Sequence, residues 1–276
     1  MIINISSTGN HTNQIYQFIQ LDSFCKERKI KYCNLQLYKL FPFFPNLKNK
    51  YGTFTAKVFF PFFSFIILCL CKIKLFKFYF LTEKNDCIKL VESIKKNPKK
   101  NYFTKGWSHD NNYIFYVNED LENKYRENYN FLFSTSIDSI KEKYFCSNCP
   151  VTIGLHIRRG DYKEYKNGIY YYNDETYISV VKQLLNLLNE KDVNVLVFTN
   201  DKSLNYDIYK NSFSNVFFSH ENFQTDYTLL ANCNYIIGAP SSFTMWSSYI
   251  GQVPLYHIKD KEKIISLSDF IISAGL

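Results

Sequence analysis

The sequence predicts an α/β protein built on parallel, doubly wound sheets. Segments typical of strands and helices alternate through the second half of the chain. The first residues show the same order on a small scale, with an apolar strand, a polar loop and a helix. The chain has 276 residues, of which 46% are hydrophobic and 18% aromatic. This is enough for one large or two medium domains, each with its own core.

The chain begins with a strand over residues 2–5, a polar loop from Ser6 to Thr12, and a helix from about Asn13. The apolar face of this helix is formed by Ile15, Phe18, Ile19 and Phe24. The loop contains neither G-x-G-x-x-G nor the lysine of a P-loop. It is therefore not a standard phosphate-binding loop.

Residues 58–71 carry no charge, and lysines flank them at positions 57, 72, 74 and 77. Fourteen residues are fewer than the ~20 needed to span a bilayer. Pro61 would also interrupt a helix near its start. Two interpretations of residues 41–81 stay open, one as buried helices and the other as a segment lying in a membrane interface.

The rest of the first half is more polar. Residues 83–96 are expected to form an amphipathic helix, and strands are expected to begin at 102–103 and over 114–117. A loop with a tryptophan and a histidine, residues 105–109, lies between them. Residues 119–145 are expected to form one or two charged helices that lead into the second half.

The second half has the clearest pattern. Strands are expected at 151–157, 193–198, 215–218, 234–238 and 253–256, and helices at 173–188, 202–211, 225–233 and 241–250. Alternation of this kind favours a parallel sheet covered by helices on both faces.

The net charge of +8 is unevenly distributed. Residues 1–104 contain 17 Lys/Arg and 5 Asp/Glu, a net +12, so residues 105–276 have a net −4. A basic first half indicates either an anionic partner, such as lipid or nucleic acid, or a solvated lysine-rich face.

The eight cysteines are interpreted as reduced thiols of a cytosolic protein. Cys146 and Cys149 have the spacing of half a metal site, but no second pair accompanies them. The start of the chain has no basic segment or cleavage site of a signal peptide. The expected location is the cytoplasm, with peripheral contact to the inner face of the cytoplasmic membrane if residues 41–81 lie in an interface.

Two of the chain's four arginines, Arg158 and Arg159, follow the expected strand 151–157 directly. Ligands of α/β proteins bind beyond the carboxyl ends of parallel strands. Arginine binds phosphate oxygens in a bidentate manner, which lysine cannot do. The pair therefore predicts an anion site, with an ion pair to Asp161 or another carboxylate as the alternative.

Two other strand ends carry polar side chains. Asn200 and Asp201 follow the strand 193–198, where Asp201 either reads a nucleotide base or caps the next helix. Ser241 and Ser242 open the helix that includes Phe243, and they either bind phosphate or act as an ordinary helix cap. The strand that ends at Arg158 in the same sheet favours phosphate binding by the two serines, whereas the two alternatives for Asp201 stay open.

Four stretches together resemble the α-1,2-fucosyltransferases of glycosyltransferase family 11, in its bacterial oligosaccharide branch. They are His-Ile-Arg-Arg-Gly-Asp-Tyr at 156–162, Phe-Thr-Asn-Asp at 198–201, the segment 226–246, and Gly9 to Gln17 with Asn13 and Gln14. Two of the family's three glycines are replaced in the last stretch, by Asn10 and Thr12. In the segment 226–246, Pro240 and Met245 replace the family's Asn and Trp.

The resemblance implies a GT-B-type fold with two facing Rossmann-like domains. Residues 1–150 would form the acceptor-side domain and residues 151–276 the GDP-fucose-binding domain. It also implies transfer of L-fucose from GDP-β-L-fucose to the 2-hydroxyl of a galactose-containing glycan, with inversion. An oligosaccharide or lipid-linked acceptor in O-antigen synthesis is expected.

The same resemblance implies the site residues. Arg158, His156 and Asp161 would be catalytic, and the donor would be held by Arg158, Arg159, Asp201, Asn200, Ser241, Ser242, Phe243, Asn13 and Gln14. No metal or other cofactor is expected, because the chain lacks an Asp-x-Asp pair and arginine can neutralise the leaving group. Candidates for the general base are Asp161, Glu164 and His11.

Two other functions stay open at this point. One is a fucosyltransferase of another linkage, such as α-1,6. The other is a non-enzymatic, basic protein that binds a membrane or a polyanion. Nucleic acid is not expected as a partner, because no RNA-binding motif is present.

Overall fold

The computed structural model describes residues 1–6, 9–51, 62–63, 65–67, 69–70, 78–108, 111, 114–115, 119–129, 132, 138–190 and 192–273. The chain forms two compact units, residues 1–132 with Leu276 and residues 133–275. The predicted α/β class with parallel, Rossmann-like sheets is confirmed in both units.

The first unit contains a four-stranded parallel sheet in the order β2-β1-β4-β3. Its strands are β1 (Ile2–Ser6), β2 (Tyr32–Asn34), β3 (Phe78–Phe80) and β4 (Tyr102–Lys105). Its helices are α1 (His11–Glu27), α2 (Pro45–Tyr51), α4 (Lys84–Lys96) and α5 (Glu119–Tyr129), with a 3-10 turn at Leu37–Leu40.

The core of the first unit joins α1 and α4 to the sheet. Leu21 and Phe24 of α1 share one buried cluster with Leu90 and Ile94 of α4 and with Ile2 of β1. Burying aliphatic and aromatic side chains of this size contributes roughly 1.5–3 kcal/mol each. The amphipathic pattern at 83–96 thus identifies α4 correctly.

Several expectations for the first unit need correction. Ile114 and Phe115 lie in helical-turn geometry, so the strand predicted over 114–117 is wrong at these residues. The strands β2 and β3 were not predicted, because three residues give too short a pattern. Half of residues 58–71 lie outside the described part of the chain. Among its described residues, Phe62, Phe63 and Phe65 are exposed.

The second unit contains a five-stranded parallel sheet in the order β7-β6-β5-β8-β9. Its strands are β5 (Val151–Ile157), β6 (Val193–Thr199), β7 (Asn215–Phe218), β8 (Tyr235–Gly238) and β9 (Leu255–His257). Its helices are α6 (Asp138–Tyr144), α7 (Asp174–Leu188), α8 (Tyr206–Ser212), α9 (Phe223–Leu230) and α10 (Ser242–Gly251). Every strand and helix predicted between residues 151 and 257 is present, within a few residues of its expected bounds.

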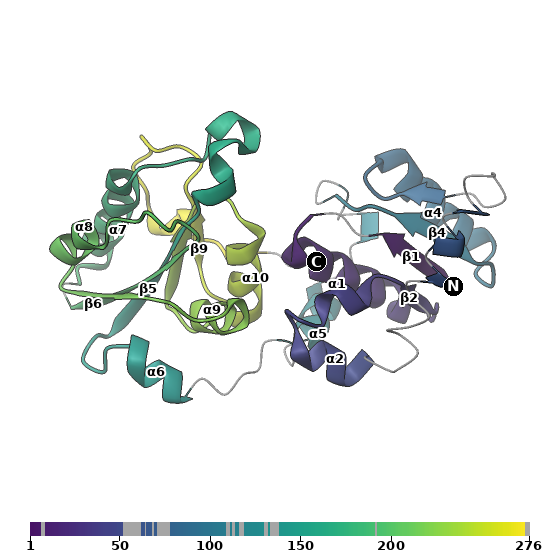
Figure 1. Ribbon diagram of the computed structural model, residues 1–276, viewed down its shortest axis with the longest axis horizontal. Helices are drawn as coiled ribbons and strands as arrows, with labels where there is room; N and C mark the ends of the chain where they lie inside the picture. Colours follow the sequence, from purple (N-terminus) through teal and green to yellow (C-terminus); the bar gives the residue numbers. More distant parts are fainter. Residues whose placement is uncertain are drawn as a thin grey trace. The chain divides into compact units, whose positions relative to one another are not determined.

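Helices cover both faces of this sheet, with α7 and α8 on one face and α9 and α10 on the other (Figure 1). Alternate residues of each strand point to opposite faces. Ile153, Leu155 and Ile157 of β5 therefore share a core with α7, whereas Phe198 and Ile236 belong to the core that includes α9. From β5 the chain continues to β6 and β7 on one side of the sheet and then crosses to β8 and β9 on the other side of β5. The strand order therefore reverses between β5 and β8, and α/β sheets bind ligands at such a point.

Candidate functional site

The candidate site lies at the carboxyl edge of the second sheet. The residues that follow β5, β6, β8 and β9 there are 158–162, Asn200 with Asp201, 239–241 and Ile258. Pairing of β5 with β8 places His156 opposite Gly238. A Cβ on Gly238 would lie 2.8 Å from the carbonyl oxygen of His156, so only glycine fits here. The predicted residues of the second half are thus brought to the edge where the strand order reverses.

The two adjacent arginines have different environments. Arg159 is 8% exposed. Its Nη2 lies 2.5 Å from Asp174 Oδ1, its Nη1 lies 3.2 Å from Asp201 Oδ2, and its Nε donates to the carbonyl oxygen of Tyr172 at 2.8 Å. The ion-pair alternative therefore describes Arg159, although with other carboxylates than Asp161. Its guanidinium ties the loop after β5 to α7 and to the end of β6.

Asp201 and Asn200 are likewise engaged with the protein. Asp201 Oδ2 pairs with Arg159, and its Oδ1 accepts from the backbone N–H and the hydroxyl of Ser203. The Oδ1 of Asn200 accepts from the backbone N–H groups of Arg159 and Gly160, at 3.0 and 3.3 Å. A Cβ on Gly160 would lie 2.6 Å from Asn200 Nδ2, which explains the glycine in this turn.

Arg158 lies on the more exposed side of the same turn. Its Nε and Nη2 contact the two carboxylate oxygens of Asp161 at 2.8 and 2.9 Å, and its guanidinium lies 5.4 Å from the centre of the Tyr162 ring. Partial burial tends to raise the pKa of Asp161, but its hydrogen bond and charge interaction with Arg158 outweigh this and lower it. Since the Asp161 side chain is 60% exposed, the pair is an orienting contact at the surface.

His156 is the buried member of the site. Its ring stacks on Phe243 with centroids 4.9 Å apart, and among the described residues its Nδ1 has no hydrogen-bond partner. Burial, reinforced by the charge of Arg158, lowers its pKa to about 3. The imidazole is therefore neutral at physiological pH, and its Nδ1 is buried and unpaired.

The start of α10 is the remaining part of this edge. Ser241 caps the helix by accepting the N–H of Phe243 at 3.2 Å, and Ser242 is its first residue. Tyr162 donates a hydrogen bond to the carbonyl oxygen of Pro240, which joins the loops after β5 and β8. A helix start with unsatisfied N–H groups next to an arginine is a favourable place for an anionic group.

Sequence reasoning missed two groups near this edge. His257, the last residue of β9, lies 2.8 Å from the hydroxyl of Thr244, and burial lowers its pKa to about 4. Asp226 of α9 accepts a hydrogen bond from Ser219, and burial raises its pKa to about 7. His257 is a single polar residue between apolar ones, and Asp226, although it opens the segment 226–246, has no local pattern that indicates its burial.

Asn13 and Gln14 belong to the first unit. The side chain of Asn10 accepts the backbone N–H of Asn13 at 3.1 Å, and Gln14 Nε2 donates to the carbonyl oxygen of Gly9 at 3.0 Å. Both residues therefore lie in the first turn of α1. Of the candidate bases, His11 stacks on Phe43 in the same unit, whereas Glu164 is exposed in the loop after β5.

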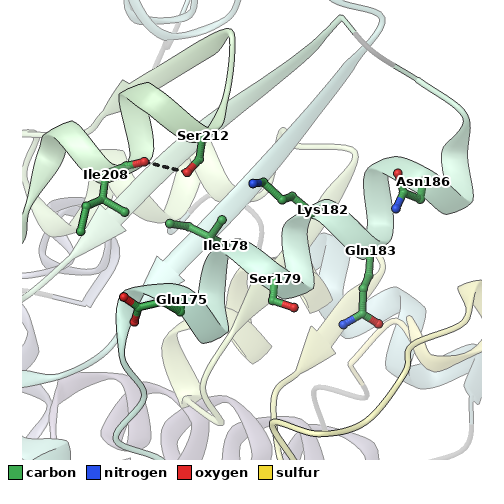
Figure 2. A pocket seen from close by; sticks show the side chains of 8 residues that line it. All are labelled: Glu175, Ile178, Ser179, Lys182, Gln183, Asn186, Ile208 and Ser212. Atoms are coloured by element: carbon green, nitrogen blue, oxygen red, sulfur yellow. Dashed lines mark hydrogen bonds between the residues drawn. The ribbon is translucent and has the colours of Figure 1, made fainter.

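A groove of about 470 Å³ lies elsewhere on the second unit. Figure 2 shows its lining side chains along α7, with Ile208 and Ser212 of α8 opposite. It contains none of the predicted site residues. Within the described ranges, no three His, Cys, Asp or Glu residues are grouped as metal ligands, and no helix has the length and apolarity to cross a membrane.

A family model described as glycosyl transferase family 11 matches residues 72–259, more than half of the chain. The chain belongs to this family. The match includes every candidate residue of the second unit, whereas Asn13 and Gln14 lie before it. No curated protein sequence matches the chain.

Family membership confirms the resemblance seen in the sequence motifs and makes the chain a glycosyltransferase. Such an enzyme takes a sugar from a nucleotide-sugar donor and places it on a glycan acceptor. The edge described above has a guanidinium, a neutral histidine and a helix start within one loop cluster. This arrangement can hold a nucleoside diphosphate group and stabilise the charge that develops on it.

Proposed function

We propose that the protein transfers L-fucose from GDP-β-L-fucose to the 2-hydroxyl of a galactose-containing glycan, with inversion at the anomeric carbon. Family membership supports fucosyl transfer over the non-enzymatic alternative. The observation that carries the proposal is the position of Arg158. It lies just after β5, at the place where the strand order reverses, in a loop that Tyr162 joins to the start of α10.

Arg158 would stabilise the departing diphosphate. Breaking the bond between the sugar and the phosphate leaves positive charge on the fucose ring and negative charge on the phosphate oxygens. A guanidinium already oriented by Asp161 and Tyr162 needs little rearrangement to meet that charge. Removing such a donor costs on the order of 10²–10³-fold in rate.

His156 and the start of α10 would complete the donor site. His156, whose neutral imidazole has one N–H donor and whose Nδ1 is unpaired among the described residues, would donate to the diphosphate or the sugar. Ser241 and Ser242 would offer hydroxyl and backbone N–H groups to the phosphates. Phe243, which is partly exposed, would pack against the donor.

Other predicted donor ligands have a different role in the proposal. Because Arg159, Asn200 and Asp201 already bind one another or neighbouring backbone groups, they would position the loop that carries Arg158. Asn13 and Gln14 remain proposed contacts of the first unit. A surface-polysaccharide acceptor, held by the first unit near a membrane, likewise remains a proposal.

The test is nucleotide binding by the purified full chain, followed by transfer assays. Thermal stability is measured with GDP, ADP, UDP and GDP-fucose, with and without EDTA, on the natural protein, on Arg158→Ala and on Lys163→Ala. Lys163 is an exposed cation of the same loop and serves as the matched control. A ligand at 100 times its Kd adds roughly 2.7 kcal/mol of stability.

The expected result is stabilisation by GDP and GDP-fucose that EDTA leaves unchanged, that Arg158→Ala loses and that Lys163→Ala keeps. The fucosylated product of a galactoside acceptor is then examined for the position of the new bond. Equal responses to GDP, ADP and UDP would contradict the GDP-specific donor site. A bond to a different hydroxyl would correct the linkage only.

A further inference from the structure

Two cysteines form a turn at the opposite end of β5. Cys146 and Cys149 lie between α6 and β5, and the backbone N–H of Cys149 donates to the carbonyl oxygen of Cys146 at 3.2 Å. The first and fourth Cα atoms of a β-turn are within about 7 Å. Disulfides span Cα distances of about 4.4–6.8 Å. The turn therefore holds the two side chains at a separation that a disulfide can bridge.

The two thiols are chemically different. The pKa of Cys146 is lowered by hydrogen bonding with the side chain of Cys149 and with the backbone N–H groups of Asn148 and Cys149. Burial and the same contact raise the pKa of Cys149 to about 11. Asn215 Nδ2 lies 3.3 Å from the sulfur of Cys149 and helps to fix it. Cys146 is therefore the thiol suited to attack a disulfide, and Cys149 remains protonated until it reacts in a second step.

Other cysteines of the described chain lack these properties. Cys25 and Cys87 are buried, and burial raises the pKa of each thiol to about 12. Cys146 and Cys149 are both partly exposed, so a small oxidant can reach them. Among the described residues, no third His, Cys, Asp or Glu joins Cys146 and Cys149 to form a metal-ligand group. The two cysteines are therefore considered as a pair of thiols.

We propose that Cys146 and Cys149 are a redox-active dithiol that closes to an intramolecular disulfide when it meets a low-molecular-weight disulfide such as oxidised glutathione. The Cys146 thiolate attacks one sulfur of the oxidant, so an S–S bond forms to Cys146 and one glutathione leaves as the thiolate. Cys149 then loses its proton and attacks the Cys146 sulfur, which releases the second glutathione. The dithiol is oxidised by two electrons, and one glutathione disulfide is reduced to two thiols.

This dithiol is separate from the proposed donor site. Seven residues of β5 lie between the turn and Arg158, a length of about 20 Å. The inference therefore does not depend on the proposed function, and its test needs no sugar nucleotide.

The experiment incubates the reduced full chain with oxidised glutathione, blocks the remaining thiols by alkylation and maps the peptides by mass spectrometry. The expected product is a peptide with a Cys146–Cys149 disulfide, lighter by two hydrogens and not alkylated. Cys149→Ser should instead accumulate the mixed disulfide of glutathione with Cys146. Cys146→Ser should react far more slowly. Cys33→Ser, which removes another partly exposed thiol, should behave like the natural chain.

The same reaction in urea tests whether the native fold, and not only the short spacing in sequence, brings the two thiols together. If the fold prepares the pair, the disulfide forms several-fold faster in the native chain than in the unfolded one. Failure to form this disulfide, or an equal rate in the two states, would overturn the proposal. Preferential attachment of glutathione to Cys149 would also overturn it, because the order of attack would be reversed.

Discussion

His257 Nε2 lies 2.8 Å from the hydroxyl oxygen of Thr244, and this contact links the end of β9 to the first turn of α10. The same hydroxyl lies 2.9 Å from the carbonyl oxygen of Ser241, whose backbone N–H points at His257 Nε2 from 3.5 Å. A hydroxyl has one proton, so these three contacts cannot all be made at once. The position of the imidazole proton decides which of them are made.

Two arrangements satisfy this proton count. With a proton on Nδ1, the single lone pair of His257 Nε2 accepts mainly from Thr244 at 2.8 Å and only weakly from the N–H of Ser241 at 3.5 Å. With a proton on Nε2, His257 donates to Thr244, Thr244 donates to the carbonyl oxygen of Ser241, and the N–H of Ser241 is released. An anion at the start of α10 would favour the second arrangement, because it can accept the released N–H. We therefore predict that His257 positions the start of α10 for the proposed donor site.

The first prediction is that His257→Ala weakens GDP binding by roughly 2- to 10-fold, the loss expected for one neutral hydrogen bond. Isothermal titration measures the Kd, and initial rates separate KM from kcat. KM should rise while kcat changes little, because His257 orients the helix start and touches no reacting atom. His257→Gln should restore part of the affinity, since its amide can also bond to Thr244.

The matched control is His220→Ala, which removes an exposed histidine of the same unit. It should leave the Kd for GDP unchanged. If His257→Ala also left it unchanged, the link between β9 and the helix start would be purely structural.

The second prediction separates the two arginines. Arg159→Ala should destabilise the protein by about 3–5 kcal/mol, because it leaves Asp174 and Asp201 without their buried partner. Arg158→Ala should cost less than about 1 kcal/mol, because its pair with Asp161 is exposed to water. Urea unfolding at pH 7 measures both. Equal losses of stability would contradict the division of roles between them.

Sequence reasoning located the edge of the sheet at which the site lies, but not the role of each residue there. The strand ends at Arg158, Asn200 and Ser241 follow from periodicity and from the rule that parallel strands align their carboxyl ends. Which of two adjacent arginines turns inward depends on Asp174 and Asp201, which only the folded chain brings to Arg159. The identity of an ion-pair partner distant in sequence has no local signal.

His257 illustrates the same limit. It lies in a three-residue strand, and its relation to Thr244 depends on how α10 packs beside β9. By contrast, the helix expected from residue 173 begins there, because Asn173 caps α7 by accepting the N–H of Thr176 three residues later. Contacts between residues close in sequence could be predicted, whereas contacts that depend on how distant elements pack could not.

The third prediction concerns stability in acid. The pKa values of His156 and His257 are lowered to about 3 and about 4, against about 6.5 in an unfolded chain. Between these values the unfolded chain binds more protons than the folded one, so the free energy of unfolding falls as the pH drops from about 6.5 to 4. The double variant His156→Asn, His257→Asn should lose less stability over this range. Urea midpoints measured between pH 7 and pH 4 test this, and an equal loss in both proteins would contradict it.

The fourth prediction concerns Asp226, whose effect has the opposite sign. Burial raises its pKa to about 7, whereas an aspartate in an unfolded chain has a pKa near 4. Between these values the folded state binds the extra proton, so this residue lowers the free energy of unfolding as the pH rises from about 4 to 7. Asp226→Asn keeps an oxygen that can accept the Ser219 hydroxyl but carries no charge. The variant should therefore be more stable than the natural protein at pH 8 and should lose this advantage near pH 4.

The control for Asp226 is Asp207→Asn, which neutralises an exposed carboxylate at the start of α8. Because water already solvates Asp207, its replacement should shift the urea midpoint little and by a similar amount at both pH values. Asp226→Asn, in contrast, should show a difference between pH 8 and pH 4 that grows through the range where the buried carboxyl loses its proton. A destabilised Asp226→Asn at pH 8 would mean that the ionised carboxylate is needed in the folded state, with Ser219 as the donor that stabilises it.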